Sequence, residues 1–520
     1  MKNERTKNAT RNILFGLLLK GYQIIIPFFM RTAIIYLMGV QYLGLNSLFT
    51  SVLQILNMAE LGVGSAIAYS MYRPIAEDDT EKICSLMKLY QIYYRIIGLI
   101  IALGGMILLP FIPHLITGDI PSELNIYILY LLNLATTVLS YWLFAYKNVL
   151  LSAHQRSDII SKISLFITTI QYLIQIAVLY YWKNYYFYLV ISLLSGVLLN
   201  ILTAIYTNKT YPNYHPTGKI DYEETKKINQ KVRDLFTSKV GFVITDSVDT
   251  IVISAFLGLS VLAVYQNYFF ILSSIVGFIT VILSSCTAGI GNSLVLETKE
   301  KNYADLKKIT FIISWIAGFC TVALLCLYQP FMEIWIGKDL ILDFKVVICF
   351  CIYFFVLIIN RILNLYKDAA GIWHEDRFRP LVTALSNLAM NLLMVRHWEI
   401  YGVILSTVLS TVFIGMPWLL NNLFTALFEK NQMKNYLKNL LCYIIVVIFS
   451  CIVTYSVCSL IVLPVWPTFF VRLIICFIFP NIIFLIIYQN HPEFYWSLEL
   501  VDKITNGKFK IIKNISNYSA

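Results

Sequence analysis

The sequence predicts an all-α, polytopic membrane protein with about 14 transmembrane helices: two parallel six-helix lobes plus two C-terminal helices. Three observations lead to this prediction. The 520 residues are 58% hydrophobic and only 13% charged, with a mean hydropathy of +0.72, whereas soluble proteins carry about 25% charged residues. Apolar runs of about 20 residues, the length that crosses a bilayer, recur along the chain. A weak internal repeat relates its two halves.

The apolar runs fall into three groups separated by polar segments. Residues 1–11 are polar and basic, and the first run is too long for a signal-peptide core, so we expect the first helix itself to insert. The predicted spans are 12–38, 43–71, 86–112, 124–151, 159–182 and 186–207, then 235–257, 261–294, 306–328, 346–372, 380–395 and 401–427, and finally 440–462 and 468–488. They define an N-terminal six-helix lobe (1–207), a cytoplasmic linker (208–234), a C-terminal six-helix lobe (235–428), and a last region (429–520) with two additional helices and a basic tail from residue 503.

Two landmarks set the period of the repeat. Gly39 aligns with Gly258 at an offset of 219, and Tyr146-Lys147 with His154 aligns with Tyr366-Lys367 and His374 at an offset of 220. Because each half has an even number of spans, both halves enter the membrane from the same side. The repeats are therefore predicted to be parallel.

The distribution of Lys and Arg predicts the orientation. With the N-terminus inside, inner segments hold 31 of the 40 basic residues and outer loops hold four, as expected when positive loops stay cytoplasmic. Both termini are therefore predicted to be cytoplasmic. This placement accounts for the net charge of +11, so we expect no nucleic-acid partner.

Basic residues near the cytoplasmic span ends are counted here with the inner segments, and five cations then remain within predicted spans, where each costs about 2.5–3.5 kcal/mol. They are Lys20, Arg31, Arg95, Arg361 and Arg472. They cannot all face lipid. We expect Arg472 to extend to the outer surface, and Arg95 either to extend to the inner surface or to face inward.

Polar residues recur at helical spacing in four spans and predict faces that line a cleft. The first span carries Lys20, Gln23, Pro27 and Arg31, and the second carries Asn46, Thr50, Asn57 and Gly64 with Glu60 nearby. Lys239, which aligns with Lys20, lies on the seventh span with Asp246, Asp249 and Thr250, and the tenth carries Arg361, Asn364 and Asp368. The structural alternatives are that Glu60 is a helix-packing hydrogen bonder and that Arg31 pairs with Asp246 or Asp249.

The sequence contains no pattern typical of a catalytic or metal site. Ser-His-Asp sets, H-x-x-x-H, phosphate loops and paired carboxylates do not emerge, and the six histidines fall at helix ends or in loops. The ten cysteines lie in or beside apolar runs without ligand-like spacing, so we expect small apolar packing groups rather than a metal site or disulfides. We therefore expect a protein that is not an enzyme and has no cofactor.

Three motifs carry a resemblance to a known family. They are Tyr42-Leu43-Gly44-Leu45-Asn46, Ala59-Glu60-Leu61-Gly62-x-Gly64-Ser65-Ala66-Ile67, and Asn387-Leu388-x-x-Asn391-Leu392-Leu393 leading to Ile400-Tyr401-Gly402-Val403-Ile404-Leu405-Ser406-Thr407. With them the chain resembles the oligosaccharide-lipid flippases of the polysaccharide exporter family, within the multidrug/oligosaccharidyl-lipid/polysaccharide superfamily. Arg396-His397-Trp398-Glu399 departs from the softer, Gly-containing turn expected there.

The resemblance implies a bacterial cytoplasmic-membrane protein that moves undecaprenyl-diphosphate-linked oligosaccharide to the outer leaflet by alternating access. The products would be capsule, O-antigen or exopolysaccharide, and the expected partners are this lipid-linked substrate, membrane lipids, and glycosyltransferases and a polymerase of the same pathway. The expected substrate-binding residues are Lys20, Gln23, Arg31, Asn46, Asn57, Glu60, Lys239, Arg361 and Asn364. Asp246 and Asp249 are candidates for coupling to a proton or sodium gradient.

Three alternatives remain open. A multidrug/cation antiporter of the same superfamily would share the fold, but the basic stripe from Lys20 to Arg31 favours an anionic cargo. A peptidoglycan-precursor flippase differs only in its substrate. A polysaccharide polymerase is less consistent with the sequence, because no predicted outer loop is long enough to carry a catalytic domain.

Overall fold

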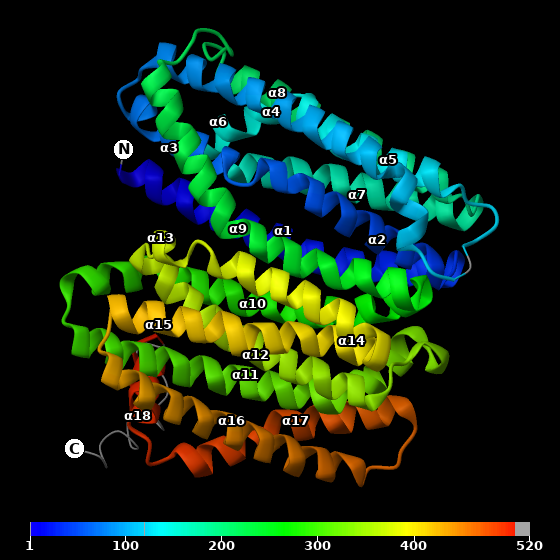
Figure 1. Ribbon diagram of the computed structural model, residues 1–520, viewed down its shortest axis with the longest axis vertical. Coiled ribbons are helices and arrows are strands. Elements are labelled where there is room, and N and C mark those ends of the chain that lie inside the picture. Colours follow the sequence, from blue (N-terminus) through cyan, green and yellow to red (C-terminus); the bar gives the residue numbers. More distant parts are fainter. Residues whose placement is uncertain (1, 119, 505–520) are drawn as a thin grey trace. The chain divides into compact units, whose positions relative to one another are not determined.

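The computed structural model describes residues 2–118 and 120–504, and the remainder of the predicted basic tail lies outside this range (Figure 1). Helices make up most of the described chain, and no strand occurs within it. The contacts divide the chain into two compact units, Met1–Gln266 and Asn267–Ala520.

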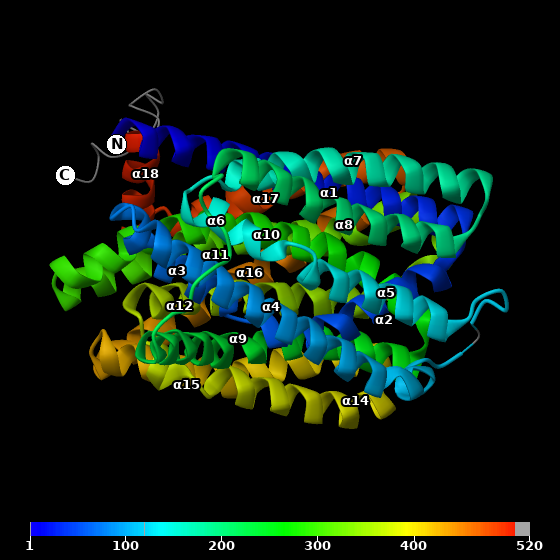
Figure 2. The same cartoon turned by 90° about the horizontal axis from the view of Figure 1, so that it is seen from above.

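In the first unit, long helices pack along one another. α1 packs on α7, α7 on α8, and α2 on α9 (Figures 1 and 2). The unit contains α1 (Lys2–Leu37), α2 (Val40–Leu56), α3 (Val63–Ala76), α4 (Thr80–Leu108), α5 (Ile126–Trp142), α6 (Asn148–Ala153), α7 (Ser157–Tyr181), α8 (Tyr185–Thr210), α9 (Tyr222–Leu257) and the start of α10 (Leu259–Leu296). α9 begins at Tyr222, so the helix that contains the span predicted at 235–257 extends back into the segment predicted as a cytoplasmic linker.

The span predicted as one helix at 43–71 is broken. α2 ends at Leu56, a 3-10 turn follows at Asn57–Glu60, and α3 begins at Val63. Gly62 lies at the break with φ 91, a left-handed conformation that other residues rarely adopt. A Cβ at Gly62 would also lie 2.7 Å from the Cβ of Leu235 on α9. The break therefore depends on a glycine, which periodicity alone did not reveal.

The span predicted at 124–151 is also divided. α5 ends at Trp142, and Phe144 adopts a left-handed conformation with φ 61. The following segment, Ala145–Ala153, is bent by 47° relative to α5.

The second unit is a bundle in which α11 contacts α12, α16 and α17 (Figure 1). Its helices after α10 are α11 (Lys299–Ile336), α12 (Phe344–Ala370), α13 (Trp373–Asp376), α14 (Arg379–Ser410), α15 (Met416–Ala426), α16 (Lys430–Ser459), α17 (Val465–Tyr488) and α18 (Pro492–Ile504). A π-helical turn at Thr411–Gly415 joins α14 to α15. The short helix α18 begins between the last predicted span and the basic tail, where the sequence predicted no helix.

The 32 residues of α14 form a hairpin rather than one straight rod. Glu399 has non-helical angles (φ 48, ψ −130), and a Cβ at Gly402 would lie 2.5 Å from the carbonyl oxygen of Met394. On one arm Asn387 donates from Nδ2 to Oγ1 of Thr407 on the other arm, across 2.8 Å. Residues 20 apart would be about 30 Å apart along a straight helix, so the chain reverses at Glu399. The sequence prediction of two spans at 380–395 and 401–427 is confirmed.

The number of candidate spans is close to the predicted number of about fourteen. Twelve helical segments of the described chain are long and apolar enough to cross a membrane, and the bent pair formed by α5 and Ala145–Ala153 adds a thirteenth. One of the twelve is the 54-residue stretch Trp373–Ala426, which the reversal at Glu399 divides in two. The chain is a multi-pass, all-helical membrane protein.

Both repeat landmarks have matching local structures. Gly39 (φ 118) and Gly258 (φ 92) each separate two helices with a positive φ. The paired Tyr-Lys motifs are buried in both halves, with Lys147 8% exposed and Lys367 7% exposed. Lysines are almost never buried without partners, and both have them: Lys147 donates to Asn208 and Lys367 pairs with Asp368 and Asp376.

Candidate functional site

The predicted polar face of the second span is present on α2. Asn46, Thr50, Gln54 and Asn57 follow one another at spacings of four, four and three residues, so they share one side of the helix over about 16 Å. Thr50 is exposed and the other three are half-buried. Of this set, Gln54 reaches α9, against which α2 packs.

α9 brings a carboxylate to this face. Nε2 of Gln54 donates a hydrogen bond to Oδ2 of Asp246 across 3.1 Å. Lys239 lies two turns before Asp246 on the same side of α9, and both side chains are exposed. Asp249, by contrast, is 7% exposed. We call Asn46, Thr50, Gln54, Asn57, Glu60, Lys239 and Asp246 the α2–α9 polar face.

At the break between α2 and α3 this face meets a cluster of tyrosines. Tyr94 donates a hydrogen bond to Oε1 of Glu60 across 3.2 Å, and Tyr90 donates to Tyr94 across 2.5 Å. The rings of Tyr94 and Tyr141 lie 5.3 Å apart, and Tyr141 donates to Oδ1 of Asn57 across 3.4 Å. We call Glu60, Tyr90, Tyr94, Tyr141 and Asn57 the Glu60 cluster.

Neighbouring residues accommodate the Glu60 carboxylate at the break between α2 and α3. Gly64 leaves room for the hydroxyl of Tyr90, which would lie only 2.9 Å from an added Cβ. The ammonium group of Lys239 is close enough to Glu60 for an electrostatic attraction. A broken helix with polar side chains and unpaired backbone ends is the arrangement that membrane transporters use to bind polar groups.

The cations expected on the first span occupy different environments. Lys20 and Gln23 are exposed on α1, and Arg31 is half-buried. Arg31 lies beside Tyr188 of α8, with which it interacts electrostatically. Nearby, Tyr22 shares a hydrogen bond of 2.8 Å with Thr169 of α7. In the part of the chain that the structure describes, Lys20 and Gln23 have no contact with the Glu60 cluster.

Sequence reasoning missed four members of this region. Gln54 continues the spacing of Thr50 and Asn57 and could have been found by extending that periodicity. Tyr90 and Tyr94 have the i, i+4 spacing of one helix face, but 35 tyrosines in the chain hide such a pair. Tyr141 comes from a separate helix, so only the fold reveals it.

Two expected site residues lie in the second unit. Arg361 is half-buried on α12. Oδ1 of Asn364 accepts a hydrogen bond from Nη2 of Arg379 across 2.9 Å. Arg379 in turn pairs with Asp376, which is 2% exposed, across 2.7 Å. Asn364 is thus part of a buried ion network, which the sequence did not indicate.

A corresponding network lies in the first unit. Asp158 is fully buried and pairs with Arg11 at 2.9 Å, Arg156 at 3.1 Å and Lys162 at 3.1 Å. Asp158 and Asp376 are separated by nearly the repeat offset, and each follows a buried Tyr-Lys motif. Buried carboxylates need such partners. Both networks therefore stabilise the fold and are not open binding sites.

His154, at the end of α6, is half-buried against an aromatic side chain. Its ring lies 4.4 Å from that of Tyr211, and Nδ1 is 2.9 Å from the carbonyl oxygen of Leu150. Burial lowers the pKa of His154. The His154 ring therefore packs against Tyr211, at the C-terminal end of α8.

The sequence matches no family model and no curated protein sequence, but the fold matches solved membrane transporters. The structure of Lipid II flippase MurJ in an inward closed conformation aligns with a TM-score of 0.68 at 16% identity, over 92% of this chain and 99% of that one. An inward-facing multidrug resistance MATE family transporter of the MOP superfamily aligns with a TM-score of 0.57 at 14% identity, over 76% and 93%. A MOP superfamily transporter from Pyrococcus furiosus, whose binding pocket is described as reversed in polarity, aligns with a TM-score of 0.52 at 13% identity, over 82% and 96%.

These alignments, together with the helices, define the fold class. The chain is a multi-pass membrane protein with the fold shared by MurJ and MATE transporters. At these identities the likeness concerns the fold.

Proposed function

We propose that this protein is a flippase that moves an undecaprenyl-diphosphate-linked oligosaccharide across the bacterial cytoplasmic membrane by alternating access, for capsule, O-antigen or exopolysaccharide synthesis. Both termini are cytoplasmic in this proposal. The observation that carries it is the α2–α9 polar face, a series of amides, hydroxyls and charges along membrane-spanning helices. Lipid cannot satisfy such groups, whereas sugar hydroxyls can.

Each part of the cargo has a matching group in the chain. Asn46, Asn57 and Glu60 offer acceptors and donors to sugar hydroxyls. Lys20, Lys239 and Arg31 supply positive charge for the diphosphate, and an Arg can grip phosphate oxygens through two parallel hydrogen bonds.

The remaining expected residues complete the proposed pathway. Gln23 belongs with the cations of α1, and Arg361 is the proposed substrate contact on α12. Asn364, which accepts a hydrogen bond from Arg379, is assigned to the buried network instead. Asp246 and Asp249 couple movement to a proton or sodium gradient. Of the two, Asp246 is the exposed carboxylate, which supports its access to an ion.

A second candidate is a peptidoglycan-precursor flippase. The observation that favours it is the alignment with Lipid II flippase MurJ over 92% of this chain. Both candidates carry a diphosphate and a sugar on a polyprenyl lipid, so the same basic and hydroxyl-binding groups serve either. They differ only in the head group.

Competition binding separates these candidates. Purified protein in nanodiscs is titrated with a fluorescent undecaprenyl-diphosphate oligosaccharide, then challenged with unlabelled oligosaccharide lipid, with lipid II, or with a cationic drug. We expect the oligosaccharide lipid to compete best. Preferential competition by lipid II would instead establish the second candidate, and competition by the drug alone would establish an antiporter.

A further inference from the structure

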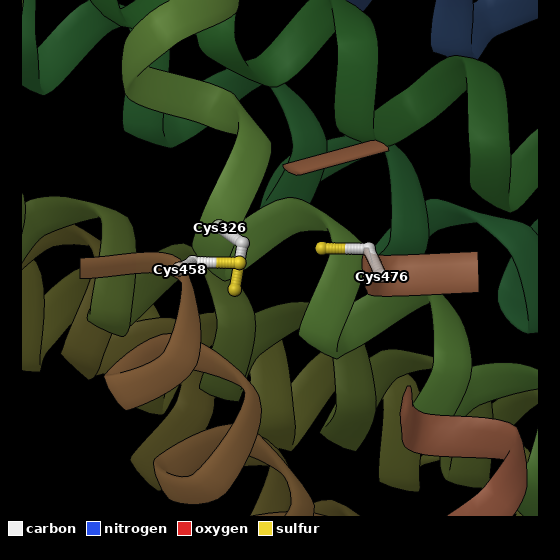
Figure 3. A group of neighbouring side chains, drawn as sticks. All are labelled: Cys326, Cys458 and Cys476. Atoms are coloured by element: carbon white, nitrogen blue, oxygen red, sulfur yellow. The ribbon is translucent and has the colours of Figure 1, made fainter. Parts of the chain in front are cut away.

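Three cysteines from separate helices converge in the second unit. Cys326 lies on α11, Cys458 near the end of α16, and Cys476 on α17 (Figure 3). Their Sγ atoms all lie within 4.8 Å of one another, and their residues are 1%, 0% and 1% exposed. The three helices pack on each other in pairs. Positions 326, 458 and 476 have no ligand-like spacing, which is why the sequence predicted only apolar packing there.

We propose that Cys326, Cys458 and Cys476 form a binding site for a soft monovalent metal ion, best matched by Cu(I), that links α11, α16 and α17. This site is independent of the proposed transport function. We call it the three-thiol site.

The geometry fits a three-coordinate ion. With metal–sulfur bonds of about 2.3 Å, a planar trigonal site places its sulfurs about 4.0 Å apart. Sulfurs that are already within 4.8 Å of one another need only small side-chain rotations to reach that spacing. In the described chain, no His, Asp or Glu joins the group.

The donor set selects the ion. Soft thiolates favour Cu(I) and Zn(II) over hard cations such as Mg²⁺ or Ca²⁺. Structural zinc almost always takes four ligands, and a fourth sulfur or nitrogen is missing from the group within the described residues. Three sulfurs therefore favour Cu(I), which needs no fourth ligand.

Charge compensation is available beside the site. Arg472 lies one turn before Cys476 on α17, and its Nη1 donates to the carbonyl oxygen of Cys326 across 3.5 Å. Its Nε is buried without a hydrogen-bond partner among the described atoms. Cu(I) bound by two thiolates and one thiol releases two protons and carries a net charge of −1, which the guanidinium balances. Buried charges need such pairing.

A route to the thiols also exists. Cys476 lines an apolar cavity of about 380 Å³ together with Leu327, Leu473 and Phe477. A small Cu(I) complex with weakly held organic ligands such as acetonitrile can enter this cavity and exchange those ligands for the thiols, beginning with Cys476.

The test uses the full-length, reduced protein in nanodiscs under anaerobic conditions. Cu(I) is supplied as its acetonitrile complex and titrated against the chelator bicinchoninate. We expect one Cu(I) per chain to be withheld from the chelator. Cys326→Ser, Cys458→Ser and Cys476→Ser should each weaken binding at least about tenfold, comparable to or larger than the loss of an outer-shell partner. The matched control, Cys442→Ser, changes an exposed cysteine on α16 and should leave binding unchanged.

X-ray absorption of the wild-type protein gives a result that needs no variant. We expect three sulfurs at about 2.3 Å from copper. Two outcomes overturn the proposal: nitrogen or oxygen ligands in the spectrum, or Cu(I) binding that depends on Cys442 and survives the three site variants. If a site variant does not fold, the spectrum alone decides.

Discussion

Gln54 of α2 and Asp246 of α9 are joined by a hydrogen bond of 3.1 Å from Nε2 to Oδ2. The bond connects the polar face of one span with a carboxylate on another, within the first unit. Since an asparagine at 246 would still accept this bond, the charge of Asp246 can be tested apart from its shape.

Asp246→Asn is expected to abolish gradient-driven transport while abundance and thermal midpoint stay near wild type. Gln54 keeps its acceptor, and only the group that binds a proton or sodium ion is lost. Transport into proteoliposomes with and without an imposed gradient measures the effect. Asp305→Asn, on α11, is the control and should transport normally. Undiminished, gradient-dependent transport by Asp246→Asn would remove this carboxylate from the coupling role.

Tyr94→Phe is expected to destabilise the Glu60 cluster. The change removes the Tyr94 hydroxyl, which donates to Glu60 and accepts from Tyr90. A buried polar group left unpaired costs about 1–3 kcal/mol. The thermal midpoint in nanodiscs should fall. Tyr93→Phe, one residue earlier, loses only a bond to Asn229 and should have a smaller effect. Equal midpoints for the two variants would show that the cluster contributes no stability.

Gly62→Ala is expected to disrupt the break between α2 and α3. The left-handed backbone at Gly62 costs an alanine about 1–3 kcal/mol, and the added Cβ would also collide with Leu235. Gly196→Ala in α8, where an added Cβ meets nothing within 4 Å, should be neutral or slightly stabilising because it favours the helix. Thermal unfolding compares the two, and a stable Gly62→Ala protein would mean that the break does not depend on glycine.

The helices were predictable from the sequence because apolar run length is a local property. The breaks within the helices were not predictable, because the backbone conformations of Gly62 and Phe144 depend on what packs against them. The site was predictable only in part. Helical spacing placed Asn57 near Glu60, but the approach of Lys239 to Glu60 comes from the packing of α9 and could not be read from spacing.

Contacts between segments that are distant in the sequence could not be predicted from it. Tyr141, Cys458 and Cys476 reach their neighbours through tertiary packing, which neither periodicity nor spacing encodes. Asp158 likewise meets Arg11 only because α1 packs on α7.

Asp158→Asn is expected to destabilise the first unit. Three cations would lose their buried anion, and breaking a buried ion pair on one side costs about 3–5 kcal/mol. Glu77→Gln breaks the surface pair with Arg73 and should change little, because exposed pairs contribute little. Thermal midpoints and membrane abundance test the comparison. A fully stable Asp158→Asn protein would show that the network is dispensable.

The central proposal, flipping of a diphosphate-linked oligosaccharide, is tested most directly in proteoliposomes. A fluorescent undecaprenyl-diphosphate oligosaccharide is incorporated into both leaflets, and an impermeant reductant is added outside. Under an imposed proton or sodium gradient, wild-type protein should expose nearly all of the fluorophore, because the inner-leaflet lipid is flipped outward. Arg31→Ala should leave the inner-leaflet fraction protected, and Arg31→Lys should recover only part of the rate because the planar two-point grip is lost. Protection of the inner-leaflet lipid with wild-type protein, while a cationic drug or lipid II is moved instead, would contradict the proposed function.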